Sequence, residues 1–127
     1  MSHSIAEAAE RTGLTAHTLR YYERDGLLLR EVERDSSGRR RYDQAHLDWI
    51  HLVTCLRATG MPIRDVRRYA ELVRSGASTE RERLELLHAH RRRVVKELAR
   101  VTDHLGAIDR KIGIYESRLE EPSAASA

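Results

Sequence analysis

The most reactive side chain in this sequence is Cys55, its only cysteine. It lies in the stretch LVTCLRATGMP (52–62), with His51 four residues before it and Arg57 two residues after it. Residues four apart share one face of a helix, so His51 could accept the thiol proton or stabilise a thiolate. The thiolate is the nucleophilic form of cysteine, and cationic neighbours favour it. The spacing is that of a thiol whose reactive form is favoured by its neighbours.

Other roles for Cys55 are open. Cysteine is among the residue types most often buried, so a lone cysteine within a helix is commonly a small core side chain. An enzyme using Cys55 with His51 is disfavoured, because the chain has no glycine-rich phosphate loop and no acidic pair that would line a cleft. We expect no metal and no cofactor, because soft metals need several thiolates and the chain offers one.

The composition is that of a globular protein of about one domain. The chain has 127 residues, of which 40% are hydrophobic and 34% charged, with a net charge of +3. No apolar run approaches the roughly 18 residues that span a bilayer, and the N-terminal MSHSIAEAAE lacks the basic and apolar regions of a signal peptide. We expect a cytoplasmic protein with no membrane partner.

Two short helices joined by a tight turn are predicted at the start of the chain. SIAE (4–7) is a capping box, and the helix that it begins should end near Gly13. Thr15 can cap a second helix, which runs to Arg24 and stops at Asp-Gly (25–26). This arrangement is a helix-turn-helix.

A hairpin and two further helices should follow. GLLLREV (26–32) and RRRY (39–42) are predicted to form two short strands of a wing around the turn DSSG (35–38). Asp43 caps a third helix, and TGMP (59–62) separates it from a fourth. The residues expected to be buried in these helices are Leu47, Ile50, Val53 or Thr54, Leu56 or Arg57, Val66, Tyr69, Ala70 and Val73.

The last third of the chain predicts one long helix that begins at a second capping box, TERE (79–82). An apolar stripe of its length needs a partner helix, and the chain has no second long helix, so we expect a homodimer with an antiparallel coiled coil. The fold class is therefore mainly α: a winged helix-turn-helix domain (1–76), a dimerisation helix (77–120) and a disordered tail (121–127). The heptad seam consists of Leu84, Leu87, Arg91, Val94, Leu98, Val101, Leu105, Ile108, Ile112, Tyr115 and Leu119.

A dimer with two helix-turn-helix units at a fixed separation is suited to read two half-sites on duplex DNA. The second helix would enter the groove, and a basic wing would neutralise phosphates. The candidate contact residues are Thr15, His17, Thr18, Arg20 and Tyr21 in the helix, and Arg39, Arg40 and Arg41 in the wing.

The sequence resembles the MerR family of bacterial transcription regulators across residues 4 to about 76. The resemblance rests on IAEAAERTGLTAHTLRYYERDGLL, the hairpin that ends in GRRRY, and LRATGMPIRDV. It implies a dimer bound to double-stranded promoter DNA between the two polymerase-recognition elements. Such regulators bend and untwist the DNA so that RNA polymerase engages both elements.

The family's DNA contacts can be carried over to the matching positions. Many relatives have proline soon after GLL, whereas this sequence continues LREVERD. The first wing strand should therefore start differently, and the role of Arg34 depends on where that strand starts. The resemblance assigns DNA contacts to Thr15, His17, Arg20, Tyr21 and Tyr22 in the helix and to Arg34, Arg39, Arg40 and Tyr42 in the wing.

The stretch CLRATGM (55–61) resembles the compact, aldehyde-responsive NmlR/AdhR-like branch of the family. The chain lacks the cysteine pairs of metal sensors, and its long helix is not followed by a drug-binding domain. The resemblance implies that an electrophile adds to Cys55 and changes the packing of the third, fourth and fifth helices. Two alternatives keep Cys55 structural: a non-covalent apolar ligand held between the dimer halves, or no effector at all.

Overall fold

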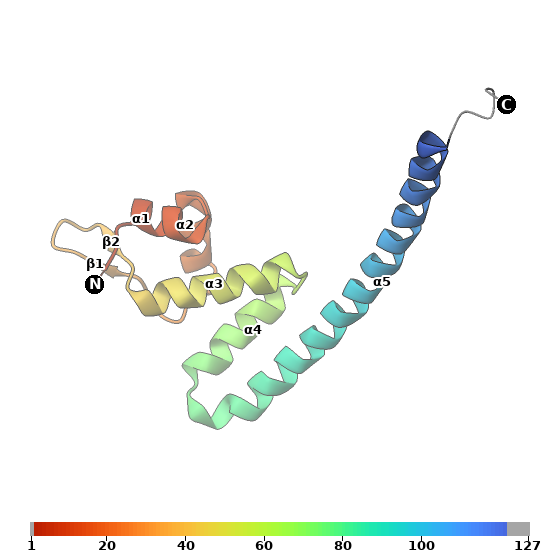
Figure 1. Cartoon of the computed structure of the whole chain (residues 1–127). Coiled ribbons are helices and arrows are strands. Elements are labelled where there is room, and N and C mark those ends of the chain that lie inside the picture. The colour runs from red at the N-terminus through yellow and green to blue at the C-terminus, as the bar shows by residue number, and fades with distance from the viewer. Residues whose placement is uncertain (1, 122–127) are drawn as a thin grey trace. The chain divides into compact units, whose positions relative to one another are not determined.

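Helices dominate the computed structural model, which describes residues 2–121 (Figure 1). These residues form two compact units, 2–90 and 91–121, each described by itself. No helix in the described part is long and apolar enough to cross a membrane. The predicted mainly α class, with a small wing and a long final helix, is confirmed. In chain order the elements are α1 (Ile5–Thr12), α2 (Ala16–Arg24), β1 (Glu33–Arg34), β2 (Arg40–Arg41), α3 (Gln44–Ala58), α4 (Ile63–Arg74), η1 (Ala77–Thr79) and α5 (Glu80–Glu120).

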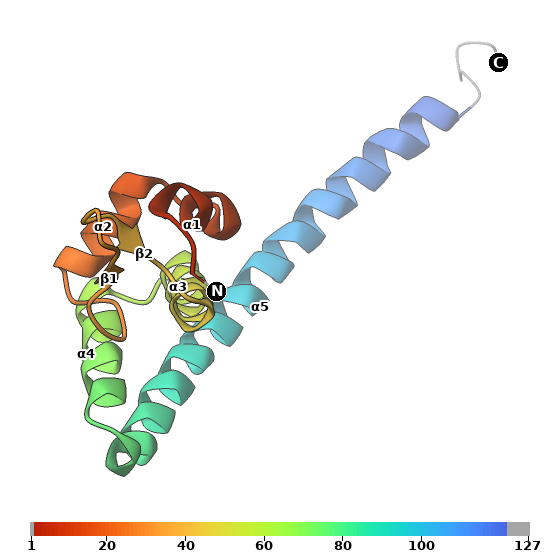
Figure 2. The same ribbon diagram turned by 90° about the vertical axis from the view of Figure 1, so that its left-hand side faces the viewer.

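The predicted helix-turn-helix is present in α1 and α2. The Ser4 hydroxyl accepts the Glu7 backbone N–H at 3.2 Å, and the Glu7 carboxylate accepts the Ser4 N–H at 3.0 Å, which completes the capping box. Gly13 ends α1 at φ 75°, and Thr15 caps α2. Helix α1 packs against both α2 and α3, as Figure 2 shows from the side.

The wing is shorter than predicted. Strands β1 and β2 pair antiparallel over two residues each, and the carboxylate of Asp35 closes the turn by accepting the backbone N–H groups of Ser37 and Arg39. Hydrogen bonds from Ser37 and Arg39 hold the pKa of Asp35 below its usual value. The strand predicted within 26–32 is wrong, because the first strand begins only at Glu33.

In segment 26–32, backbone carbonyls accept hydrogen bonds from side chains of later helices and not from a neighbouring strand. Leu27, Leu28 and Val32 are buried in it. The indole N–H of Trp49 donates to the Leu27 carbonyl at 2.7 Å, and Arg74 donates to the Leu28 carbonyl at 2.7 Å. Buried carbonyls need such partners. The segment is therefore fixed by α3 and α4 and not by strand pairing.

The buried face of α3 includes two residues that the heptad-like spacing missed, His46 and Trp49. The Trp49 ring stacks on Tyr69 of α4, with the ring centroids 5.5 Å apart and the planes 2° from parallel. In α4 the residue buried near the C-terminal end is Leu72, whereas Val73 is only half-buried. These aromatic and aliphatic contacts join α3 to α4.

The start of α5 differs from the predicted second capping box. The Thr79 hydroxyl donates to the Leu72 and Gly76 carbonyls, so it caps the end of α4 and the turn after it. The compact unit also runs past Gly76, because His90 lies 2.8 Å from the Thr59 hydroxyl. Of the tail predicted at 121–127, all but Glu121 lies outside the described residues.

The Trp49 contact gives a stability prediction. Trp49→Phe leaves the Leu27 carbonyl buried without its donor, so the free energy of unfolding should fall by about 2 kcal/mol or more. Tyr69→Phe keeps the ring stack and removes a hydroxyl that has no hydrogen-bond partner among the described residues. It should therefore change the free energy of unfolding by less than about 0.5 kcal/mol. Urea unfolding of both variants measures this, and equal losses would contradict the role of the indole N–H.

Candidate nucleic-acid interface

The exposed face of α2 carries most of the predicted contact residues. Thr15, His17 and Arg20 are exposed, and Thr18 is half-buried. Within residues 2–121, no hydrogen bond or ion pair engages the side chain of His17 or Arg20. One face of α2 therefore presents two unengaged side chains, His17 and Arg20, beside the Thr15 and Thr18 hydroxyls, which are hydrogen-bonded to each other at 3.0 Å. The opposite face is packed into the core through Leu19 and Tyr22.

Tyr22 differs from the other predicted contacts in its burial. It is 7% exposed and belongs to the hydrophobic core, so its ring supports the helix, and its contact with DNA stays a prediction. The ring of the neighbouring Tyr21 is half-buried and lies 6.2 Å from that of Tyr22.

Tyr21 is held in place by charged neighbours at the end of α2. Its hydroxyl donates a hydrogen bond to the Asp25 carboxylate, which raises the pKa of the phenol, and burial adds to the effect. The Arg24 guanidinium lies over the Tyr21 ring, 5.8 Å from its centroid. A phenol fixed in this way keeps its proton and can act only as a neutral group near DNA.

The predicted basic wing is divided between free and engaged arginines. Arg39 is exposed, and Arg34 donates to the Gly38 carbonyl at 2.8 Å within the hairpin. Arg40 forms a 2.8 Å ion pair with Glu23 of α2. Arg41 donates to the hydroxyl and the carbonyl of Ser2 at 3.1 and 2.8 Å. Arg40 therefore ties the wing to α2, and Arg41 ties it to the N-terminal segment.

Tyr42, at the end of the wing, is likewise part of the core. Its side chain is fully buried, and burial raises the pKa of its phenol. Its backbone pairs with that of His3 at 2.7 and 2.8 Å, and its ring meets His46 of α3 edge-on. Tyr42 therefore anchors the wing to the core, and its contact with DNA stays a prediction.

Two residues that the sequence interpretation missed support α2 from behind. Arg67 donates to the carbonyl and the carboxylate of Asp25, and Arg74 donates to the Gly26 and Leu28 carbonyls. In the sequence these arginines alternate with acids, which is typical of a solvated helix face. Their spacing of seven residues, two helical turns, was the signal that both lie on one face.

Cys55 is exposed, in contrast to the core position that a lone cysteine commonly takes. Its sulfur lies 3.8 Å from Nε2 of His51, as the four-residue spacing predicts. Arg57 does not bond the thiol, because its guanidinium donates to the Met61 carbonyl. No three His, Cys, Asp or Glu side chains within residues 2–121 are grouped to hold a metal ion.

Comparisons with known proteins agree with this geometry. The profile of the family described as MerR HTH family regulatory protein matches residues 3–72. An uncharacterised HTH-type transcriptional regulator of Haemophilus influenzae is 37% identical over 116 residues, which cover 91% of this chain and 85% of that protein. The HTH-type transcriptional regulator AdhR of Bacillus subtilis is 40% identical over 93 residues, covering 73% of this chain and 66% of AdhR.

Two solved structures resemble the whole fold. HiNmlR, described as a MerR family regulator lacking the sensor domain and bound to promoter DNA, is 35% identical, with a TM-score of 0.84 over 100% of both chains. A MerR family regulator from Listeria monocytogenes is 34% identical, with a TM-score of 0.85 over 92% of this chain and 88% of that one.

The free cations of α2 and the wing predict different effects on DNA binding. Arg20→Ala should weaken binding to the chain's own promoter by about tenfold or more and spare random DNA, because a base contact is lost. Arg39→Ala should weaken both DNAs alike and flatten the salt dependence, because a phosphate contact is lost. Fluorescence anisotropy at several salt concentrations measures both. An equal loss on promoter and random DNA for Arg20→Ala would contradict its role in recognition.

Proposed function

This chain belongs to the MerR family of helix-turn-helix regulatory proteins, and on that premise we propose that it is a dimeric regulator that binds and distorts its promoter. The observation that carries the proposal is the full-length likeness to HiNmlR, which was solved on promoter DNA. The family members named above are transcription regulators, so the chain is a regulator and not an enzyme. Its proposed partner is RNA polymerase bound to the same promoter, and its proposed location is the cytoplasm.

The DNA contacts follow from which side chains are free. Arg20 and His17 on the exposed face of α2 read base edges in the major groove, with Thr15 and Thr18 beside them. Arg39 neutralises phosphates, and Arg34 orders the wing through Gly38. Arg40 and Arg41 hold the wing against α2 and the N-terminal segment, so their effect on DNA is through its position.

The apolar seam of α5 supports the dimer. Leu98, Val101, Leu105, Ile108 and Ile112 are each 47–63% exposed, although residues of these types are normally covered. At 1.5 Å per residue, a seam over 84–119 is about 50 Å long. Antiparallel pairing places the first residues of the two helices at opposite ends, and so separates two DNA-reading units for two half-sites.

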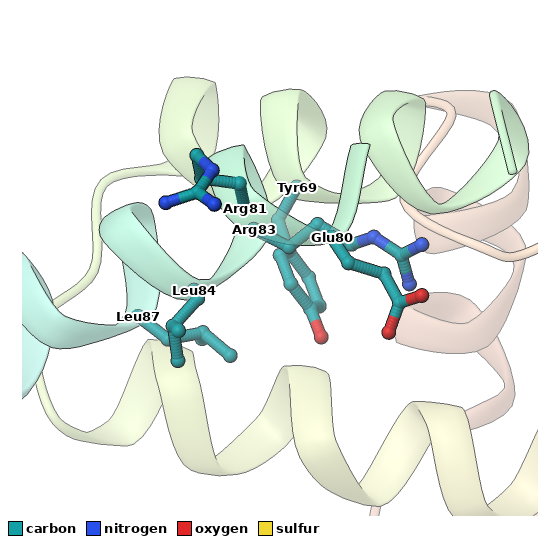
Figure 3. A pocket seen from close by; sticks show the side chains of 6 residues that line it. All are labelled: Tyr69, Glu80, Arg81, Arg83, Leu84 and Leu87. Carbon is teal, nitrogen blue, oxygen red and sulfur yellow. The ribbon is translucent and has the colours of Figure 1, made fainter. Parts of the chain in front are cut away.

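A groove beside the first turns of α5 continues this seam. It has a volume of about 460 Å³, and Leu84 and Leu87 of the seam line it together with Tyr69 of α4 (Figure 3). Because its apolar lining belongs to the same stripe, we assign it to the dimer contact. Its charged residues Glu80, Arg81 and Arg83 surround that lining.

The effector that we propose is a thiol-reactive electrophile such as an aldehyde, which adds to Cys55. The exposed sulfur and the imidazole 3.8 Å away support this, because the base can take the proton as the carbon–sulfur bond forms. The similarity to AdhR supports the same branch of the family. A non-covalent ligand at the dimer contact, with Cys55 structural, is the alternative.

The seam predicts the effect of one buried charge. Leu105→Glu should convert the dimer into monomers at micromolar concentration and abolish promoter binding, because pairing would bury a carboxylate in an apolar layer. Ile114→Glu is the matched control, because Ile114 is 44% exposed and lies outside the seam. Sedimentation velocity measures the mass, and a dimeric Leu105→Glu variant would exclude this seam as the interface.

If Cys55 is the sensor, the transcriptional response to an electrophile should require its sulfur atom. In transcription assays with the chain's own promoter and RNA polymerase, formaldehyde should raise transcription with the native protein and not with Cys55→Ser. His51→Ala should slow the response without abolishing it, because it removes the base and leaves the thiol. If Cys55→Ser responds like the native protein, the sensing site is non-covalent. If neither responds, the thiol has no sensing role for this reagent.

A further inference from the structure

The end of the recognition helix α2 is built so that some of its carbonyls need partners from elsewhere. The Leu27 N–H donates to Tyr22 and the Gly26 N–H to Glu23, with Gly26 at φ 72°. These two bonds form a Schellman motif. The carbonyls that follow, those of Asp25, Gly26 and Leu28, accept no backbone N–H within the described residues, and the first two lie at the helix end where the dipole is negative.

Two arginines of α4 supply the missing donors. Arg67 donates from Nε to the Asp25 carbonyl at 3.1 Å and from Nη2 to its carboxylate at 3.3 Å. Arg74, two turns later on the same face, donates from Nη1 to the Leu28 carbonyl at 2.7 Å and to the Gly26 carbonyl at 3.3 Å. Their positive charges also oppose the negative end of the helix dipole.

Helix α4 is also bonded to the start of α5. Arg83 donates to the Gly76 carbonyl at 2.9 Å and to the Thr79 hydroxyl at 3.1 Å, and Thr79 donates to the Leu72 carbonyl. Helix α4 is thus bonded to the end of α2 on one side and to the first turns of α5 on the other. A displacement at the start of α5 would therefore be carried by α4 to α2.

We propose that Arg67 and Arg74 are positioning residues that fix the direction of the recognition helix relative to α4, and so set the half-site spacing that the dimer accepts. This rests on the proposed function, because it concerns how two copies of α2 are aimed at DNA. The two arginines act through the Asp25–Leu28 backbone and need no contact with DNA themselves.

The experiment measures affinity against half-site spacing. The operator in the chain's own promoter is mapped by footprinting, and DNAs with one or two base pairs added or removed between its halves are titrated by anisotropy. The native dimer should lose about tenfold in affinity for each step away from the best spacing, because the DNA must twist to fit. The double variant Arg67→Ala, Arg74→Ala should show a flatter profile, with less than about threefold loss for each step.

Arg64→Ala is the matched control. It removes the same charge from the same helix, but its side chain is 84% exposed and its partner is the neighbouring Asp65 at 4.0 Å and not the end of α2. Its spacing profile should keep the native steepness. Urea unfolding and sedimentation check that each variant is a folded dimer. If the double variant does not fold, the single variants Arg67→Ala and Arg74→Ala replace it, since each keeps one of the two contacts.

Three results would overturn the proposal. The double variant could keep the native profile while affinity falls equally at every spacing, which would indicate a stability effect. The same uniform loss with a flatter salt dependence would indicate a phosphate contact. Equal flattening by Arg64→Ala would indicate a charge effect. By contrast, a native protein that binds its promoter without any preferred spacing, or does not bind it, would contradict the proposed function itself.

Discussion

The structure depends on one constraint: segment 26–32 buries Leu27, Leu28 and Val32, yet it has no strand partner for its backbone. Buried carbonyls cost free energy unless they accept a hydrogen bond. The donors come from two helices that follow much later in the chain, Trp49 of α3 and Arg74 of α4. The contact between the helix-turn-helix and the later helices is therefore specified by a few directed bonds as well as by apolar packing. We propose that these bonds also fix the orientation of the recognition helix.

The same constraint explains how the chain uses its arginines. A guanidinium offers several donors in a fixed plane, which suits it to backbone carbonyls and carboxylates. Arg40, Arg41 and Arg74 are engaged within the protein, whereas Arg20 and Arg39 have no hydrogen bond or ion pair within the described residues. Basic composition alone therefore overstates the DNA-contacting surface. The free cations lie on α2 and at the tip of the wing, where they can meet a phosphate or a base edge without breaking an internal bond.

The apolar seam of α5 poses a different demand. Its side chains are about half exposed in the single chain, and the proposed dimer would gain free energy by removing this apolar surface from water. The groove at Leu84 and Leu87 belongs to the same stripe. Helix α4 is bonded to the end of α2 through Arg67 and Arg74 and to the start of α5 through Thr79, so in the proposed dimer it would connect dimerisation with DNA reading. This gives a physical route for an effector to act on DNA without contacting it.

The sequence by itself determined what depends on local spacing: the capping box at Ser4, the ends of α1 to α4, the heptad seam and the proximity of His51 to Cys55. These follow from helical periodicity and capping chemistry, which act over a few residues. Only the tertiary structure decided which side chains form contacts with residues distant in the sequence. It placed Tyr22 and Tyr42 in the core, replaced the expected strand at 26–32 with a segment bonded to α3 and α4, and directed Thr79 back to α4. The hydrogen bonds that fix Tyr42, segment 26–32 and Thr79 join residues 7 to 48 positions apart in the sequence, which local spacing does not encode.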